Sequence, residues 1–209
     1  MNKSVKHTDA DKFKRNFKSY EYRVWDSSAS LSQADLEATF GKGRHETRTD
    51  TYLPPLQNYL PKLRGQTRLE LKEKIDKIDG VEVWERSVSA DFPVSQPELE
   101  QFARCTPNLE YPTEVFQDAD SALAYIRDRL ATISIEKNRT LYELDIRGKL
   151  AAEIELSTVS FKNESHLTLA IECSDLQSAL NLASELDLRR SENMSYADWI
   201  RKQAGQDNQ

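Results

Sequence analysis

The sequence of 209 residues contains little cysteine, histidine and glycine. Its two cysteines, Cys105 and Cys173, are too few and too far apart for a disulfide framework or a zinc site, so we expect reduced thiols in a cytoplasmic protein. Three scattered histidines form neither a metal cluster nor a nucleophile and base pair, so any bound metal would need carboxylate ligands. With six glycines, and neither G-x-x-x-x-G-K-[ST] nor G-x-G-x-x-G, the chain lacks the common phosphate-binding loops.

Long apolar runs are absent as well. No run approaches the roughly 18 apolar residues of a membrane span, and the basic N-terminal stretch lacks the apolar core of a secretory signal. The formal net charge of −6 argues against a general nucleic-acid binder, although it is compatible with a local basic pocket. We expect a single domain over residues 19–202, with a flexible N-terminus over 1–18 and a flexible tail over 203–209.

Polar and apolar residues alternate with period two in seven segments, and this alternation predicts strands. The segments are 19–25, 67–75, 81–89, 131–139, 140–147, 150–159 and 166–173. Capping residues followed by helical periodicity predict helices between and after them. These helices are expected over 32–40, 96–104, 119–130, 175–187 and 195–203.

Several predicted strands have one charged face and one apolar face. In the first, Glu21 and Arg23 share a face opposite Tyr20, Tyr22 and Val24. For a single strand, a sheet with its polar face in water explains this alternation. Because acids and bases mix across the strands, we favour a closed sheet with a polar lumen, and eight strands enclose room for side chains or one small ligand. The predicted fold class is therefore α+β, a mainly antiparallel eight-stranded tunnel-like barrel with helices packed on the outside.

Several short motifs follow one another in an order that resembles the CYTH superfamily, also called triphosphate tunnel metalloenzymes. That superfamily includes thiamine triphosphatases, inorganic triphosphatases and class IV adenylyl cyclases. Each motif consists of a few common residues, so the collinear order carries the resemblance. The stretches are TDTYLP (49–54), KLRGQTRLELK (62–72), ERSVS (85–89), EKNRTLYEL (136–144), LAAEIELSTVSF (150–161), LTLAIECSDLQSALNLASELDL (167–188) and MSYADWI (194–200).

The resemblance implies a site for a triphosphate-bearing anion inside the barrel. Lys and Arg side chains would neutralise its roughly four negative charges through charge-assisted hydrogen bonds. The substrate-binding residues implied are Lys62, Arg64, Lys72, Arg86, Lys137 and Arg139.

The resemblance also implies Mg²⁺ or Mn²⁺ held by carboxylates. The implied ligands are Glu21, Glu155 and Glu172, with Glu153 substituting for a missing acid. The metal would polarise the phosphoryl group or activate the attacking water, and Glu21 and Arg23 are the catalytic residues implied.

The first strand departs from the family pattern E-x-E-x-K. A direct overlay on YEYRVW places two tyrosines and a valine at the three functional positions, whereas a shift by one residue places Ser19, Glu21 and Arg23 there. We expect the shifted frame, because the direct overlay would turn two charges onto an apolar surface at a cost of several kcal/mol. Further along, Ser157 and Ala170 stand where the family has acids, so the acidic set is thinned while the basic set is nearly complete.

Three functions stay open at this point. We favour a metal-dependent hydrolase acting on a small-molecule triphosphate, nucleotide or polyphosphate, or on an RNA 5′-triphosphate end, with no membrane partner. The alternatives are a catalytically weakened or inactive binding module, and a nucleotidyl cyclase in which a ribose hydroxyl attacks instead of water. The insertion over 27–47 is a candidate for shaping the tunnel mouth, and Tyr52, Tyr196 and Trp199 are expected to pack rather than contact a ligand.

Overall fold

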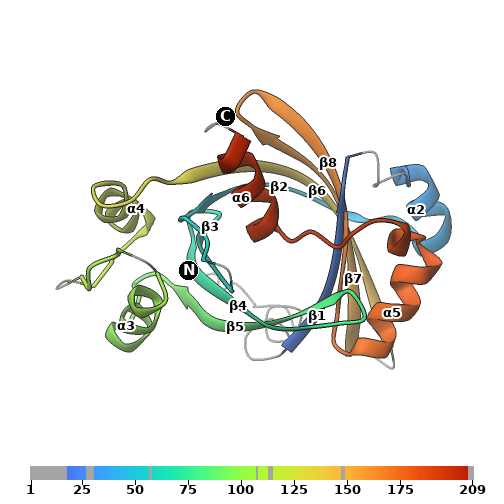
Figure 1. The fold of residues 1–209 in the computed structure, drawn as a ribbon, viewed down its shortest axis with the longest axis horizontal. Helices are drawn as coiled ribbons and strands as arrows, with labels where there is room; N and C mark the ends of the chain where they lie inside the picture. The colour runs from blue at the N-terminus through green and yellow to red at the C-terminus, as the bar shows by residue number, and fades with distance from the viewer. Residues whose placement is uncertain are drawn as a thin grey trace, which may run out of the picture.

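Eight antiparallel strands close into a barrel in the order β1-β5-β4-β3-β2-β6-β7-β8 (Figure 1). The structure is a computed structural model that describes residues 18–26, 31–56, 58–106, 108–112, 115–146 and 149–206. The strands are β1 (Lys18–Trp25), β2 (Arg44–Tyr52), β3 (Tyr59–Arg64), β4 (Arg68–Ile78), β5 (Val81–Asp91), β6 (Ile133–Ile146), β7 (Lys149–Phe161) and β8 (Glu164–Cys173). The predicted fold class, an α+β tunnel-like barrel of eight mainly antiparallel strands, is confirmed.

Six of the eight strands were predicted from alternation, and β2 and β3 were missed. The segments 131–139 and 140–147 are not two strands, because they form the single strand β6. Strand β2 reads RHETRTDTY and has no apolar face before Tyr52, and β3 reads YLPKLR with Pro61 inside it. Both departures hide a strand from a search for apolar alternation, since proline cannot donate to a sheet ladder.

The helices form close to the predicted segments. They are α2 (Gln33–Phe40), α3 (Gln96–Arg104), α4 (Ala119–Arg127), α5 (Leu176–Glu185) and α6 (Tyr196–Gln206). Among the described helices, none is long and apolar enough to cross a bilayer. The insertion over 27–47 contains α2 and the start of β2, while residues 27–30, 1–17 and 207–209 lie outside the described residues, and 203–206 belong to α6.

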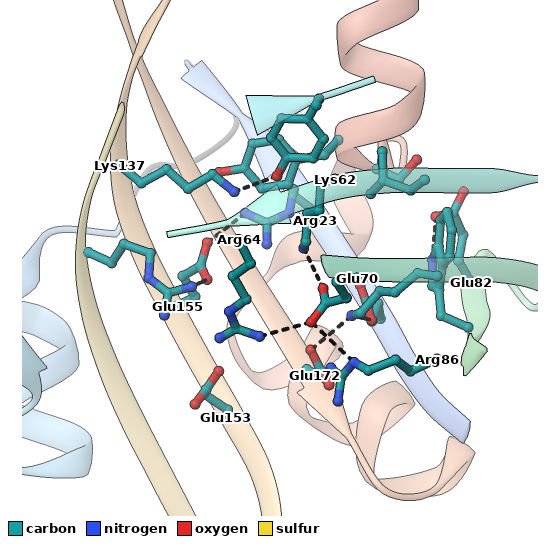
Figure 2. Close-up of a pocket in the computed structure, with 18 of the residues that line it drawn as sticks. Arg23, Lys62, Arg64, Glu70, Glu82, Arg86, Lys137, Glu153, Glu155 and Glu172 are labelled. Carbon is teal, nitrogen blue, oxygen red and sulfur yellow. Dashed lines mark hydrogen bonds and ion pairs between the residues drawn. The ribbon is translucent and has the colours of Figure 1, made fainter. Parts of the chain in front are cut away.

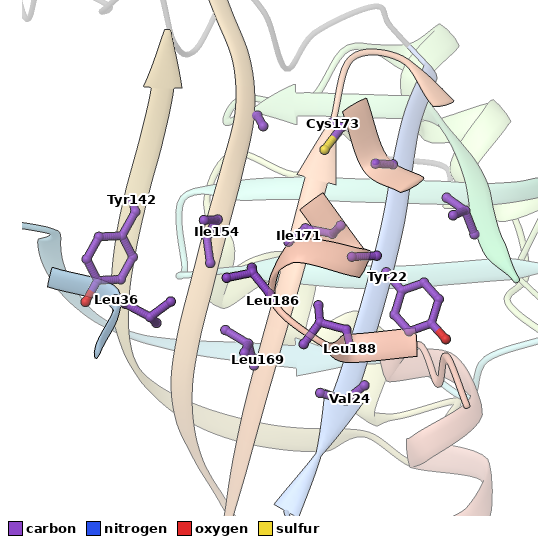
Figure 3. Close-up of a cluster of buried hydrophobic side chains, with 14 residues drawn as sticks. Tyr22, Val24, Leu36, Tyr142, Ile154, Leu169, Ile171, Cys173, Leu186 and Leu188 are labelled. Carbon is purple, nitrogen blue, oxygen red and sulfur yellow. The ribbon is translucent and has the colours of Figure 1, made fainter. Parts of the chain in front are cut away.

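The outer face of the barrel is apolar where helices cover it. Tyr22 and Val24 of β1 are buried in a cluster with Ile171 of β8 and with Ala179 and Ala183 of α5 (Figure 3). On the other side of the barrel, a second cluster joins β4 and β5 to α3 and α4 (Figure 1). Side chains alternate along a strand, so the packing of Tyr22 and Val24 places the neighbouring Glu21 and Arg23 toward the lumen, as expected. The correspondence of these residues with the family pattern stays a prediction.

Helix α6 covers one end of the barrel. Its Tyr196, Ala197, Trp199 and Ile200 are buried in one cluster with side chains from β1, β2, β3, β5, β6 and β7. Trp199 stacks on Trp25 with ring centroids 4.4 Å apart. Since one helix touches strands from around the barrel, the lumen is closed by an aromatic layer at this end.

Candidate functional site

A cavity in the barrel lumen brings together all the site residues predicted from the sequence (Figure 2). They come from seven of the strands, and their chemical roles stay predictions. The residues that line the cavity are Glu21, Arg23, Lys62, Arg64, Lys72, Arg86, Lys137, Arg139, Glu153, Glu155 and Glu172.

Strand alternation explains how these polar side chains reach the lumen. On β4, Leu69 and Leu71 are fully buried in the cluster with α3 and α4, so Glu70 and Lys72 face inward. A barrel interior filled in this way holds charged groups in a confined space of low effective dielectric. Each such group therefore needs a partner, and the structure provides three groups of ion pairs and a more exposed acidic row.

The first group surrounds Glu70, which is fully buried. Its Oε1 lies 2.6 Å from Lys62 Nζ, and its Oε2 lies 3.2 Å from Arg64 Nη1 and 3.3 Å from Arg86 Nε (Figure 2). Burial alone would raise the pKa of Glu70, but the charges of these cations hold the pKa well below its usual value. Glu70 is therefore an ionised carboxylate, and the sequence analysis assigned it no role.

The second group surrounds Glu155. Arg139 Nη1 lies 2.7 Å from its Oε2 and Arg23 Nη1 lies 3.1 Å from its Oε1. Burial opposes ionisation, but the two arginines hold the pKa of Glu155 well below its usual value. Arg23 also lies over the ring of Tyr196, 4.5 Å from its centroid. Glu155 therefore neutralises one arginine from β1 and one from β6.

The third group surrounds Asp50, which is also fully buried. Lys137 Nζ lies 2.9 Å from Asp50 Oδ2 and Arg48 Nε lies 2.8 Å from Asp50 Oδ1. Lys137 also donates a 2.6 Å hydrogen bond to the Tyr52 hydroxyl and lies over the ring of Tyr196, 3.8 Å from its centroid. Tyr52 and Tyr196, predicted to be packing residues, thus pack in the aromatic layer and also contact the cations of the cavity.

A row of glutamates on neighbouring strands also lines the cavity, and Glu21 and Glu172 in it are more exposed than the buried Glu153. Glu21 of β1 is opposite Glu172 of β8, which is opposite Glu153 of β7. Lys72 Nζ lies 2.6 Å from Glu21 and 3.4 Å from Glu172, and these two glutamate side chains are 21% and 25% exposed. This row forms an acidic rim beside the inner cations.

The carboxylates do not fit a metal centre as they are placed. Among the described residues, no group of three or more acids, histidines or cysteines could hold a metal ion. Glu155 is held between two arginines and Glu21 by Lys72. Because these oxygens already neutralise cations, the predicted ligands act as internal counter-ions in this arrangement.

The inner cavity has more cations than carboxylates. Among the described residues, seven cations bind the three carboxylates of Asp50, Glu70 and Glu155, which is a local excess of four positive charges. When Lys72 and the other lining acids, Glu21, Glu82, Glu153 and Glu172, are counted as well, eight cations face seven carboxylates and the excess is one. The cationic side chains are 3% to 19% exposed, and Glu46, which also contacts two of them, is balanced by Arg44. The seven cations are Arg23, Arg48, Lys62, Arg64, Arg86, Lys137 and Arg139.

The pKa of Lys137 reflects its burial first and the neighbouring cations second. Burial lowers its pKa well below the usual value, and the charges of Lys62 and Arg48 lower it further against the opposing effect of Asp50. The free space among the side chains is about 70 Å³, enough for a few water molecules. A larger ligand would therefore have to displace some of the ion-paired side chains.

Sequence reasoning missed Arg48, Asp50 and Glu70 as members of the site. Arg48 and Asp50 lie on β2, where charges at every second residue, starting from Arg44, were the available signal. Glu70 was recognised as lying on the charged face of its strand. Alternation predicts the face of the strand on which a side chain lies, but it does not predict the side chain's ion-pair partner. Its contacts depend on the register of β4 with β3, in which Glu70 is opposite Lys62.

Comparisons with known proteins give similar folds but no assignment. No protein-family model matches the sequence, and no curated protein matches it. A candidate adenylate cyclase from Bacillus halodurans is 13% identical, with 88% of this chain and 97% of that chain covered and a TM-score of 0.46. A candidate adenylyl cyclase from Hippeastrum, described as having a dominant triphosphatase activity, is 13% identical, with 81% and 88% covered and a TM-score of 0.47. At these values the similarities assign neither a family nor an activity to this chain.

Proposed function

We propose that the lumen binds the triphosphate group of a small molecule, a nucleotide or a polyphosphate. The observation that carries this proposal is the gathering of seven buried cations around three carboxylates in the inner cavity, a local excess of four positive charges. A triphosphate ester supplies about four negative charges on closely spaced oxygens, which accept charge-assisted hydrogen bonds from Lys and Arg. Such a ligand would compensate the excess that the protein's own carboxylates leave.

The energetics support a polyanion over a neutral ligand. Two opposite charges about 4 Å apart attract by about 4 kcal/mol at an effective dielectric of 20, so several such contacts offset much of the cost of removing phosphates from water. The hydroxyl of Tyr196, which is buried and lines the cavity, has no hydrogen-bond partner among the described residues. A phosphate oxygen would supply the missing acceptor.

Hydrolysis with Mg²⁺ or Mn²⁺ stays a prediction from the sequence resemblance. The glutamates predicted to hold the metal neutralise cations instead, so we derive no catalytic step from them. Binding and turnover are separable properties of this cavity, and the experiment must measure both.

The test is a panel of thiamine triphosphate, tripolyphosphate, ATP and an RNA 5′-triphosphate, each with and without Mg²⁺ or Mn²⁺. Calorimetry measures binding and phosphate release measures turnover. We expect at least one triphosphate to bind, and Arg139→Gln to weaken its binding at least about tenfold, which is 1.4 kcal/mol. The matched control is Arg190→Gln, because the Arg190 side chain is 82% exposed. If no anion bound with a Kd below about 1 mM, or if both variants behaved alike, the proposal would be wrong.

A further inference from the structure

Glu70 occupies the place at which an anion would meet three of the cations. Lys62 and Arg64 reach its carboxylate from β3 and Arg86 reaches it from β5, while Glu70 itself lies on β4 between them. Figure 2 shows the three side chains converging on this one carboxylate. We call these four residues the Glu70 cluster. A phosphoryl group offers the same kind of acceptor oxygens as a carboxylate, so both compete for the same donors.

The strand register shows why an anion is needed at this point. Lys72 of β4 is directly opposite Arg86 of β5, and like charges in opposite positions destabilise a sheet. The carboxylate of Glu70 binds Arg86, while Lys72 turns to Glu21 and Glu172. In the ligand-free cavity, Glu70 therefore supplies the negative charge that a ligand would otherwise supply.

We propose that Glu70 is an internal competitor of the ligand and sets which anions the cavity accepts. The inference rests on the proposed function. An entering triphosphate must take Lys62, Arg64 and Arg86 away from an ionised carboxylate, so a weakly charged anion such as monophosphate gains too little to do so. Glu70 thus lowers the affinity for all anions and excludes the less charged ones.

The test is calorimetric titration of the full chain with tripolyphosphate and with inorganic phosphate, both without metal. In Glu70→Gln the three cations lose their competitor, and we expect tripolyphosphate to bind at least about tenfold more tightly than to the wild type. We also expect phosphate binding to become measurable. The matched control is Glu82→Gln, because Glu82 is buried in the same cavity but pairs with Lys74 rather than with the Glu70 cluster. This control removes an equal charge and should change the affinity less than about threefold.

A structural role alone would give a different result. If Glu70 only holds the strands together, Glu70→Gln should lower the melting temperature and leave tripolyphosphate affinity equal or weaker, which would overturn the inference. On our inference the lower melting temperature is restored by tripolyphosphate, and more strongly than in the wild type. Glu70→Asp keeps the charge but shortens the side chain, so it should bind with intermediate affinity, and it serves if Glu70→Gln does not fold.

The titration also separates this inference from the proposed function. If the wild type binds tripolyphosphate and Glu70→Gln binds it no better, only the role of Glu70 is wrong. If neither the wild type nor any folded Glu70 variant binds tripolyphosphate, the proposed function is wrong and the inference falls with it.

Discussion

Removing the two partners of one ion pair in the cavity should have unequal effects on stability. Glu155 binds Arg23 at 3.1 Å and Arg139 at 2.7 Å. Glu155→Gln leaves Arg23 without a carboxylate and Arg139 with only the more exposed Glu46, and it raises the excess of positive charge, so we expect it to cost about 3–5 kcal/mol of unfolding free energy. Arg23→Met leaves Glu155 paired with Arg139 and lowers that excess. Its cost should be about 1–3 kcal/mol, from the lost charged hydrogen bond and the stacking on Tyr196.

The assay is urea unfolding at pH 7 of the wild type, both single variants and the double variant. In the double variant only Arg139 has lost a carboxylate, and it keeps Glu46, so the two costs should fall short of additivity by about 0.5–3 kcal/mol. Adding tripolyphosphate should restore more stability to Glu155→Gln than to Arg23→Met. Equal costs for the two single variants, or strict additivity, would refute the picture of a cavity with excess positive charge.

Three other properties should follow from the same structure. Trp199→Ala removes the ring that stacks on Trp25 and should lower the unfolding free energy by about 3–5 kcal/mol, measured by urea unfolding. Burial raises the pKa of Asp50 and of Glu70, but neighbouring cations outweigh burial and hold both pKa values below their usual range. These ionised carboxylates therefore stabilise the fold above a pH of about 4, and they stabilise it less as the pH falls. The urea midpoint should therefore fall from pH 5 to pH 3, and a constant midpoint would contradict this. Burial depresses the pKa of Lys137. At a pH above that pKa, anion binding should therefore be accompanied by the uptake of a proton, which calorimetry detects as a binding heat that depends on the buffer. This buffer dependence should be lost in Lys137→Met.

Much of the fold can be predicted from the sequence, because a strand with one apolar face and one polar face shows alternation of apolar and polar residues. Tyr22 and Val24 had to face apolar packing and Glu21 the lumen, and the structure places them so. Strand β2 gave no such signal, since its residues from Arg44 to Thr51 are polar on both faces. Its position in the barrel comes from pairing with β3 and β6, which is a long-range property that no local pattern encodes.

The candidate site was predictable as a set of residues but not as a set of contacts. Alternation and motif order brought Lys62, Arg64 and Arg86 into one lumen, but the same information offered Glu70 as one more charge on a striped strand. The structure shows that Glu70 is a shared counter-ion, because three cations from two strands contact its carboxylate. The types of charged residue alone suggested cations that are available to a ligand. In the structure, these cations are already paired with a carboxylate.

On the proposed function, the stability of the barrel and its affinity for anions are therefore opposed. Each buried carboxylate that neutralises the cations stabilises the ligand-free barrel, and the same carboxylate has to be displaced when a polyanion enters. Asp50, Glu70 and Glu155 neutralise only part of the charge of the seven inner cations, and burial together with the charges of Lys62 and Arg48 lowers the pKa of Lys137. A cavity built only for stability would need fewer cations or more acids around them. On the proposed function, a ligand would account for the surplus of lysine and arginine, and the buried acids would limit which ligands carry enough charge to bind.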